Sequence, residues 1–275
     1  MKSDITFGQY VEGDSLIHRL DPRIKIVIAL IYIVVIFLAK SATAFALLTA
    51  AAVVFVLMTG IPPRLIFRAM RPLVFIIVFT AVINLFFMRG EHLLFEFHFI
   101  RIYREGIVNA FLIVLRILLL IVATSVFMTY TTTPLALTDA LEQLLNPLKK
   151  LRVPVHEFSM MMTIALRFIP TLIDETQKII NAQTARGADF TTGSLLQRGR
   201  ALIPILIPLF ISAFRRADEL ATAMECRCYT GGEGRTRMNS LKSEPKDWIF
   251  FSLILLLGAA VVCLNRFFPL VTIRL

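Results

Sequence analysis

Cysteine is scarce in this chain, and the few cysteines present do not form a metal site. The 275 residues include three, Cys226, Cys228 and Cys263. A Cys-x-Cys pair needs a second Cys or His cluster to complete the usual set of four ligands, and no such cluster accompanies it. The sequence therefore predicts no metal site and reduced thiols that act as small side chains.

Asp, Glu and His are missing from the interiors of the long apolar segments. A proton relay, an intramembrane metal site or a cation pathway would need some of these side chains. Elsewhere, Ser and Thr lack a nearby His and acid in the arrangement of a catalytic triad, and no glycine-rich loop ends in Gly-Lys-Ser/Thr. We therefore predict no catalytic residue and no cofactor bound by this chain.

What the chain has in abundance is apolar side chains, which make up 57% of it and give a mean hydropathy of +0.76. This composition predicts an integral membrane protein. The 17% of charged residues is too high for a chain that lies wholly in the bilayer, so a sizeable water-facing part is expected. The net charge of +10 is attributed to Lys and Arg held on the cytoplasmic side, because no basic run interleaves with aromatics as nucleic-acid binding would require.

Five apolar stretches are long enough to cross a bilayer, and we predict an all-α polytopic fold with about five or more spans. The short segment 60–71 has three arginines and no acid, and the long polar segment 132–247 is rich in Lys and Arg. The positive-inside rule places both in the cytoplasm. The predicted regions are 1–131 with about four spans, a cytoplasmic domain over 132–247, and 248–275 with the last span. The stretches are 24–39, 41–59, 72–88, 106–131 and 248–264.

The polar segment reads as three helices. Residues 135–151 form a short amphipathic pattern interrupted at Asn146-Pro147, and residues 155–186 carry apolar side chains at helical spacing. A second long helix is expected over 200–227. Its first half is apolar enough that a short extra span through 195–214 stays open.

Two arginine triplets close the two long helices: Ala185-Arg186-Gly187 and Cys226-Arg227-Cys228. A cation at a helix C-terminus complements the helix dipole, and a following glycine is an ordinary terminator, so simple capping is one interpretation. The other is docking, because small flanking residues allow a close approach and a guanidinium can bind a partner's carboxylate with two hydrogen bonds. Spacing alone leaves both interpretations open.

Arg116 is the ionisable residue that lies well inside a predicted span. Such residues are costly in the bilayer and are either functional or tightly paired. We interpret Arg116 as a structural residue in the bundle interior, hydrogen-bonded to neighbouring helices, with Asn84 as a candidate partner.

The chain resembles the transmembrane T component of energy-coupling factor transporters, the vitamin-uptake branch of the ABC transporters. The resemblance covers nearly the whole chain, and it is the combination of its short motifs that is specific. The matching stretches are His18-Arg19-Leu20-Asp21-Pro22-Arg23, Thr131-Thr132-Thr133-Pro134, Leu166-Arg167-Phe168-Ile169-Pro170, Gln183-Thr184-Ala185-Arg186-Gly187-Ala188 and Ala223-Met224-Glu225-Cys226-Arg227-Cys228-Tyr229.

The resemblance implies a non-catalytic coupling subunit in the cell membrane. It implies that coupling helices ending in two Ala-Arg-Gly triplets bind two cytosolic ATPase subunits, which carry the ATP and Mg²⁺. It also implies one or more small membrane S components that capture a vitamin and reorient when the coupling helices move. Arg186 and Arg227 match the two triplet arginines. The second triplet departs from the pattern, because Cys228 stands where the conformational freedom of glycine is expected.

Three rival functions remain distinguishable. A dedicated T component of a cobalt or nickel uptake system would share the coupling helices and differ in its partners. A membrane-embedded enzyme would need acids or histidines clustered at the membrane face, and a secondary transporter acting alone would need intramembrane acids; neither feature is visible. The identity of the substrate is not expected to follow from this sequence, because the resemblance places substrate recognition on the S component.

Overall fold

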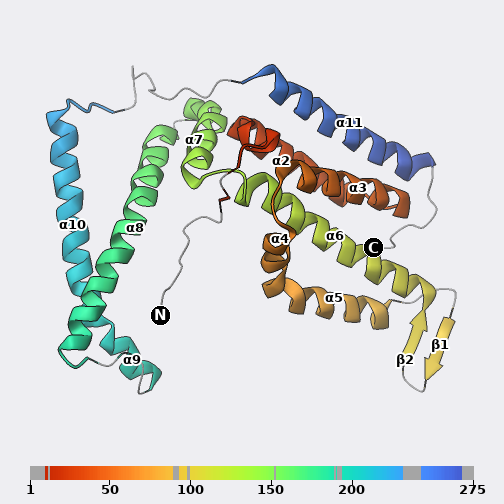
Figure 1. Ribbon diagram of the computed structural model, residues 1–275, viewed down its shortest axis with the longest axis horizontal. Coiled ribbons are helices and arrows are strands. Elements are labelled where there is room, and N and C mark those ends of the chain that lie inside the picture. Colours follow the sequence, from red (N-terminus) through yellow and green to blue (C-terminus); the bar gives the residue numbers. More distant parts are fainter. Residues whose placement is uncertain are drawn as a thin grey trace. The chain divides into compact units, whose positions relative to one another are not determined.

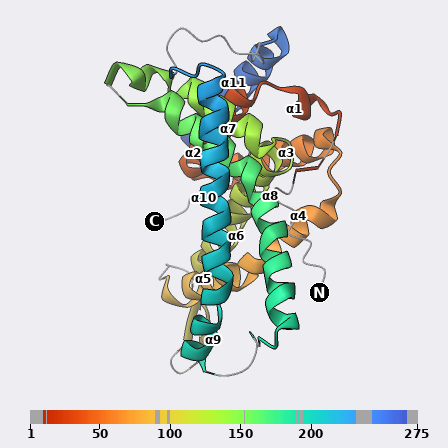
Figure 2. The ribbon, with the colours of Figure 1, turned by 90° about the vertical axis from the view of Figure 1, so that its left-hand side faces the viewer.

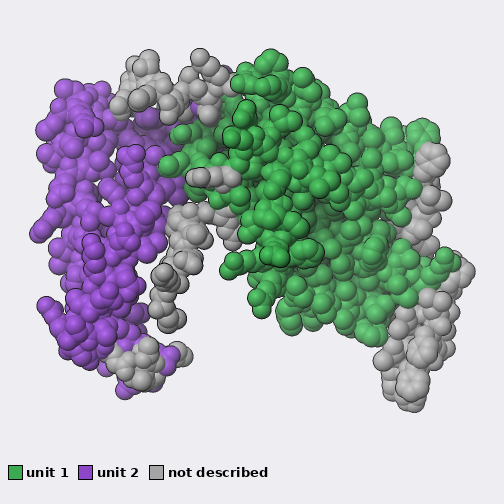
Figure 3. All heavy atoms as spheres, in the orientation of Figure 1, with its two compact units in different colours: residues 1–140, 240–275 green, residues 141–239 purple. Residues whose placement is uncertain are grey.

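The computed structural model describes residues 10–11, 13–88, 93–97, 100–151, 153–188, 190, 194–231 and 243–267. Contacts within the chain divide it into two compact units, which Figure 3 shows in different colours. Unit 1 comprises residues 1–140 and 240–275, and unit 2 comprises residues 141–239.

Unit 1 is built from helices, with one short hairpin. Figure 1 shows α2, α3 and α11 side by side, with the long helix α6 against them and α5 along α6. The elements are α1 (Leu16–Arg19), α2 (Pro22–Leu38), α3 (Ala42–Thr59), α4 (Pro63–Met70), η1 (Arg71–Leu73), α5 (Val74–Phe87), β1 (Leu93–Phe97), β2 (Ile100–Tyr103), α6 (Arg104–Thr124), η2 (Ser125–Thr129) and α11 (Pro245–Phe267). Helix α7 (Pro134–Leu144) begins in unit 1 and ends in unit 2.

Four helical segments within the described residues are long and apolar enough to cross a membrane. They are Ala42–Thr59, Pro63–Phe87, Arg104–Thr129 and Pro245–Phe267. The fifth expected span is helix α2, which has 17 residues and lies at the short end of the range for spanning helices. All five predicted apolar stretches are therefore helical, and the predicted all-α membrane fold is confirmed.

Helix α2 runs parallel to α11 and is tied to it at both ends. At the first end, the backbone N–H of Asp21 donates to the carboxylate of Asp247 at 3.1 Å. At the other, the side chain of Asn265 accepts from the backbone N–H groups of Lys40 and Ser41, each at 3.1 Å, and donates to the carbonyl of Leu38 at 2.8 Å. Helix α2 therefore lies along a helix that is long and apolar enough to cross the bilayer.

The core of unit 1 is an aromatic cluster between these helices. The rings of Tyr32, Phe55, Phe127 and Phe250 meet mainly edge to face, with the closest centroids 5.4 Å apart. The Tyr32 hydroxyl donates to the carbonyl of Leu48 at 3.1 Å, so the one polar atom at the centre of this apolar cluster has a partner. These contacts join α2, α3, η2 and α11 into one packed body.

Lys25 joins the first turn of α2 to both neighbouring segments of unit 1. Lys25 is 1% exposed, and its ammonium donates to the carbonyls of His18 at 3.0 Å and Thr131 at 2.8 Å. Close by, Arg23 forms an ion pair with Asp21 at 2.6 Å, and the backbone N–H of Asp21 donates to Asp247 of α11. Thr131, which precedes α7, and Ser243, which precedes α11, are therefore held at the same end of α2.

Two parts of unit 1 differ from the expected pattern. The segment 60–71, expected to be a loop between spans, is helical as α4 and η1, and the helix direction changes where Pro72 interrupts the backbone hydrogen bonds, as Figure 1 shows between α4 and α5. The connection between α5 and α6 contains the antiparallel hairpin of β1 and β2. Its short alternating strands were too brief to stand out from a polar loop.

Unit 2 consists mainly of two long antiparallel helices. The break expected at Asn146-Pro147 is confirmed, because α7 stops at Leu144 and η3 (Asn146–Leu151) follows. The two long helices are confirmed as α8 (Val155–Ala185) and α10 (Ile203–Cys226), with α9 (Leu195–Ala201) between them. Figure 2 shows α8 and α10 along their length.

Helix α10 is not among the segments whose composition permits a membrane span. Its first half is apolar, but Arg215, Arg216, Asp218 and Glu219 occupy the second half. Each charged side chain is costly in a bilayer interior, so the helix as a whole does not meet the requirement.

Gly258 of α11 packs closely against α2, and its replacement is predicted to weaken unit 1. A Cβ atom built on Gly258 would lie 3.0 Å from Cγ2 of Val35. We expect Gly258→Leu to push the helices apart at a cost of about 1–3 kcal/mol, measured as a lower melting temperature of the purified protein. The matched control is Ala259→Leu, whose side chain is exposed. Equal melting temperatures for the two variants would contradict this packing.

Candidate functional site

The first arginine triplet forms the C-terminal end of α8. Arg186 is the C-cap residue and Gly187 follows it in the left-handed conformation, with φ at 87°. The N–H of Gly187 donates to the carbonyl of Thr184 at 2.9 Å, and that of Ala188 donates to Gln183 at 3.0 Å. This pair of bonds is the Schellman motif, which satisfies the last carbonyls of the helix through the backbone.

The second triplet ends α10 with the same motif. Arg227 is the C-cap residue, the N–H of Cys228 donates to Glu225 at 2.8 Å, and that of Tyr229 donates to Met224 at 3.0 Å. Cys228 has φ at 56°, the one left-handed non-glycine residue within the described parts of the chain. The departure from glycine therefore leaves the geometry of the helix end intact, and the backbone of Cys228 carries the strain.

Both guanidinium groups are available to a partner. Residues Ala185, Arg186 and Gly187 are exposed, as are Cys226, Arg227 and Cys228. Among the described residues, neither arginine makes a side-chain hydrogen bond or ion pair. Each guanidinium thus projects from a helix end whose carbonyls the backbone already satisfies, so neither is needed to cap its helix.

The two arginines lie at opposite ends of the antiparallel pair. The side chain of Gln183, near the end of α8, donates to the carbonyl of Pro204 at the start of α10, at 3.4 Å. Arg227 follows the last residue of α10, a helix of 24 residues that rises roughly 36 Å. The pair therefore presents two separate arginine tips, and no single small site includes both.

A polar cluster joins α8 to α10 midway between the tips. The carboxylate of Glu175 accepts from the Ser212 hydroxyl at 2.8 Å and from the Arg216 guanidinium at 2.7 Å. Glu175 precedes Arg186 by the same number of residues as Arg216 precedes Arg227. The helices point in opposite directions, so each tip lies about 16 Å from this link.

The link is ionised at ordinary pH. The hydrogen bonds from Ser212 and Arg216 lower the pKa of the Glu175 carboxyl below its ordinary value of 4.5. Because the pKa is lowered on folding, the ion pair stabilises the folded state at pH values above the ordinary pKa. This stabilisation is lost as the pH falls through the lowered pKa. The ion pair between Glu175 and Arg216 therefore links α8 to α10 throughout the neutral pH range.

Exposed apolar side chains line the first half of α10 and the start of α8. Because the helices are antiparallel, these two groups of side chains lie at opposite ends of the pair, and exposed apolar surface of this kind marks contact with a membrane or a partner. On α10 the exposed residues are Ile203, Leu206, Ile207, Phe210, Ile211 and Phe214, and on α8 they are Phe158, Met161 and Met162.

Comparison with known proteins identifies the family. The profile of the CbiQ family, described as a cobalt transport protein, matches residues 13–238. The chain is 52% identical over 262 residues to the energy-coupling factor transporter transmembrane protein EcfT of Ruminiclostridium cellulolyticum, covering 95% of each chain. It is 45% identical over 257 residues to EcfT of Bacillus subtilis, covering 93% of this chain and 97% of the relative.

The chain belongs to the CbiQ/EcfT family. It is a transmembrane component of an energy-coupling factor transporter, and the family resemblance inferred from its sequence is confirmed. EcfT of Clostridium kluyveri matches over 267 residues at 50% identity, covering 97% of this chain and 98% of the relative. The family match thus includes both long helices of unit 2 and the helices of unit 1.

In this family member, Arg116 is a bundle-interior residue, 9% exposed. Its guanidinium donates to the carbonyl of Ala39, at the C-terminal end of α2, at 2.7 Å and lies over the rings of Phe37 and Phe45. Asn84, the partner proposed from the sequence, donates instead to Thr80 in its own helix. The sequence missed Ala39 because a backbone carbonyl has no residue-specific signature.

The three cysteines lie in exposed positions and are free. Within the described residues, no group of three or more His, Cys, Asp or Glu side chains is placed to hold a metal ion. Cys226 and Cys228 flank Arg227 at the tip of α10, where their small side chains leave the guanidinium accessible.

The Glu175 link is predicted to restrain the two long helices. We expect Glu175→Gln to speed hydrogen–deuterium exchange of the backbone amides in α8 and α10 several-fold, because the ion pair to Arg216 is lost. Asp174→Asn is the matched control, since Asp174 is an exposed acid next in the sequence. Identical exchange in the two variants would show that the link has no restraining role.

Glycine at position 228 is predicted to relieve strain at the tip of α10. Because glycine adopts the left-handed conformation without a Cβ clash, Cys228→Gly is expected to stabilise this helix end by about 1 kcal/mol. The measurement is amide exchange over the last turn of α10. Cys226→Gly is the control and is expected to speed amide exchange, because residue 226 is helical and glycine there weakens the helix. Faster exchange in Cys228→Gly would refute the prediction.

Proposed function

We propose that this chain is the coupling subunit of an energy-coupling factor importer that takes up a vitamin or another micronutrient. It transmits the ATP-driven movement of two ATPase subunits to a small substrate-binding S component in the membrane. ATP and Mg²⁺ bind to the ATPases, and this chain carries no catalytic group. It resides in the cell membrane of a bacterium, with residues 132–247 on the cytoplasmic side.

The observation that carries the proposal is the pair of exposed arginine tips. Arg186 and Arg227 end antiparallel helices in the same backbone motif, and each guanidinium is unpaired among the described residues. A free guanidinium at a helix end is suited to a carboxylate on a partner. Two equivalent tips roughly 36 Å apart match two copies of one kind of partner, which is the composition of an ATPase dimer.

The same geometry weighs against capping as the sole role of the arginines. The Schellman bonds of both helices satisfy the terminal carbonyls by backbone N–H groups. An arginine side chain is therefore not required at either position for the helix to end. The fixed position of the C-cap residue instead sets the direction in which the guanidinium leaves the helix.

The exposed apolar residues of α10 support a membrane partner as well. The row that includes Leu206, Phe210 and Phe214 lies on a helix whose composition does not permit it to span a bilayer alone. We assign this row to contact with the S component, an apolar protein that would cover it. Movement of α10 at its Arg227 end would then reach the S component through one continuous helix.

A dedicated cobalt or nickel transporter is the second candidate, favoured by the description of the matching family profile as a cobalt transport protein. The coupling helices serve both functions, so partner identity distinguishes them. Purification of the tagged chain from its native membranes in mild detergent identifies the co-eluting proteins. Several small membrane subunits indicate the shared vitamin type, and a dedicated metal-binding subunit indicates the metal type.

Loss of both arginines is predicted to detach the ATPases. We expect Arg186→Ala with Arg227→Ala to lower ATPase co-purification and substrate uptake by roughly tenfold or more, because each tip loses a charge-assisted contact. Each single variant is expected to have an intermediate effect, since the other tip remains. The readouts are the ATPase-to-chain ratio in the purified complex and uptake by whole cells.

The matched control is Arg198→Ala with Arg200→Ala, which removes two exposed arginines from α9 in the same unit. This control is expected to keep both ATPases. Wild-type complex yield and uptake in the Arg186/Arg227 double variant would overturn the proposed docking role.

A further inference from the structure

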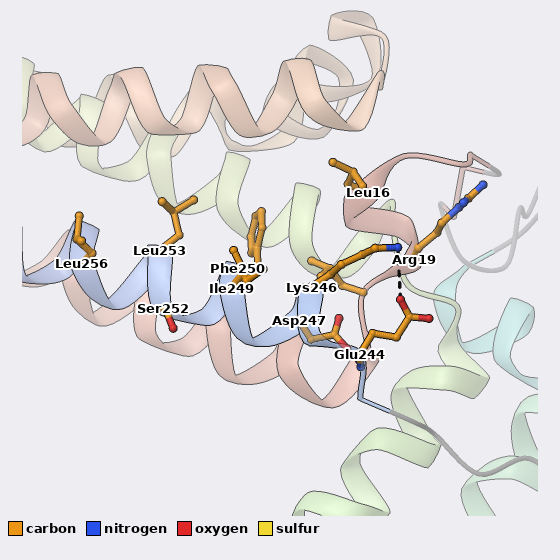
Figure 4. Close-up of a pocket in the computed structure, with 11 residues that line it drawn as sticks. Leu16, Arg19, Glu244, Lys246, Asp247, Ile249, Phe250, Ser252, Leu253 and Leu256 are labelled. Carbon is orange, nitrogen blue, oxygen red and sulfur yellow. Dashed lines mark hydrogen bonds and ion pairs between the residues drawn. The ribbon is translucent and has the colours of Figure 1, made fainter.

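A groove of about 550 Å³ lies in unit 1 between α1 and the first half of α11. Its volume is within the range of small-molecule sites. Figure 4 shows the side chains of α1 on one side of it and those of α11 on the other. The lining residues that matter most are Leu16, Arg19, Glu244, Lys246, Leu253 and Leu256.

The groove is polar at one end and apolar along its length. Glu244 and Lys246 flank the start of α11, and Arg19 lines the groove from α1, with its guanidinium directed away from them in Figure 4. Further along the helix, Leu253 and Leu256 follow at helical spacing, and they are 51% and 68% exposed. Because α11 is a membrane-spanning helix, this apolar wall is open to acyl chains.

The cations at the polar end are only weakly paired. Arg19 lies 3.4 Å from Asp14, and Lys246 lies 3.6 Å from Glu244, with side chains 64–93% exposed. Exposed pairs at such distances contribute little stability, so a phosphate can replace them. The carboxylate of Asp247 is different, because it is 3% exposed and accepts from the N–H groups of Asp21 and Glu244.

The position of Trp248 marks this end of α11 as the headgroup level of the bilayer. It is the one tryptophan in the sequence, lies in the first turn of α11 and is 60% exposed. Exposed tryptophan gathers at the membrane–water interface, where its ring is amphipathic. The charged end of the groove therefore lies where phospholipid headgroups lie, and the apolar wall extends from there along the spanning helix.

We propose that this groove binds a phospholipid whose headgroup carries both a phosphate and a primary ammonium. Arg19 and Lys246 bind the phosphate, and the Glu244 carboxylate accepts from the ammonium. The upper part of one acyl chain lies along Leu253 and Leu256, and the remainder stays in the bilayer. Among the residues that line the groove, two cations beside one exposed acid match a zwitterionic headgroup better than one with a phosphate alone.

The test is native mass spectrometry of the full chain, purified with its co-eluting subunits and stripped of lipid. Phosphatidylethanolamine, phosphatidylcholine and phosphatidylglycerol with identical acyl chains are added separately, and inorganic phosphate is added as a competitor. We expect phosphatidylethanolamine to bind about threefold to fivefold more tightly than the other two, because the choline headgroup has no N–H donor and the glycerol headgroup has no ammonium. Millimolar phosphate is expected not to displace it.

Two variants test which side chains bind the phosphate and which binds the ammonium of the headgroup. Arg19→Gln with Lys246→Gln is expected to lower phosphatidylethanolamine binding by more than roughly tenfold, since each cation near a membrane surface contributes about fivefold. Glu244→Gln is expected to abolish the preference over phosphatidylglycerol while binding persists. Arg64→Gln with Arg68→Gln is the matched control, because it removes two cations from exposed positions on α4.

Three results would overturn the proposal. The first is equal binding of all three lipids, the second is wild-type binding by the Arg19/Lys246 double variant, and the third is displacement by inorganic phosphate. The substituted side chains are all exposed, and co-elution of the partner subunits with each variant checks that the chain remains folded.

Discussion

The buried ammonium of Lys25 is the interaction on which the arrangement of unit 1 depends. A buried charge is costly unless it is hydrogen-bonded, and here two carbonyls from distant segments, His18 and Thr131, accept from the ammonium. Asp21 lies at the same end of α2. Its carboxylate pairs with Arg23, and its backbone N–H donates to Asp247 of α11. The start of the spanning region, the end of α6 and η2, and the start of α11 are thus fixed around one helical turn.

The same turn of α2 holds two segments of unit 1, one that precedes α7 and one that precedes α11. Thr131 is held by Lys25, and Ser243 donates to Asp21. Forces that reach these two points from residues 132–242 act on the same turn of α2 and so do not pull on two independent helices.

Much of the fold was predictable because its signals are local. Apolar length identified the spanning helices, and Gly187 with the charged second half of α10 identified the ends of the long helices. Contacts between distant segments were not predictable. The register of the antiparallel helices α8 and α10 brings Glu175 to Arg216, and opposite charges occur too often for such a pair to be chosen from sequence. The left-handed backbone conformation of Cys228 could not be predicted from the sequence either, because cysteine rarely adopts it.

The pairing of α2 with α11 has a consequence for how the protein is made. Helix α2 is synthesised early, whereas the residues that hold it, Asp247, Gly258 and Asn265, are added only after the whole polar segment has been synthesised. Until then the Asp21 N–H and the Leu38 carbonyl have no partner from α11, and α11 does not cover the face of α2 at Val35. The packing of α2 is therefore completed only when the last spanning helix has been made.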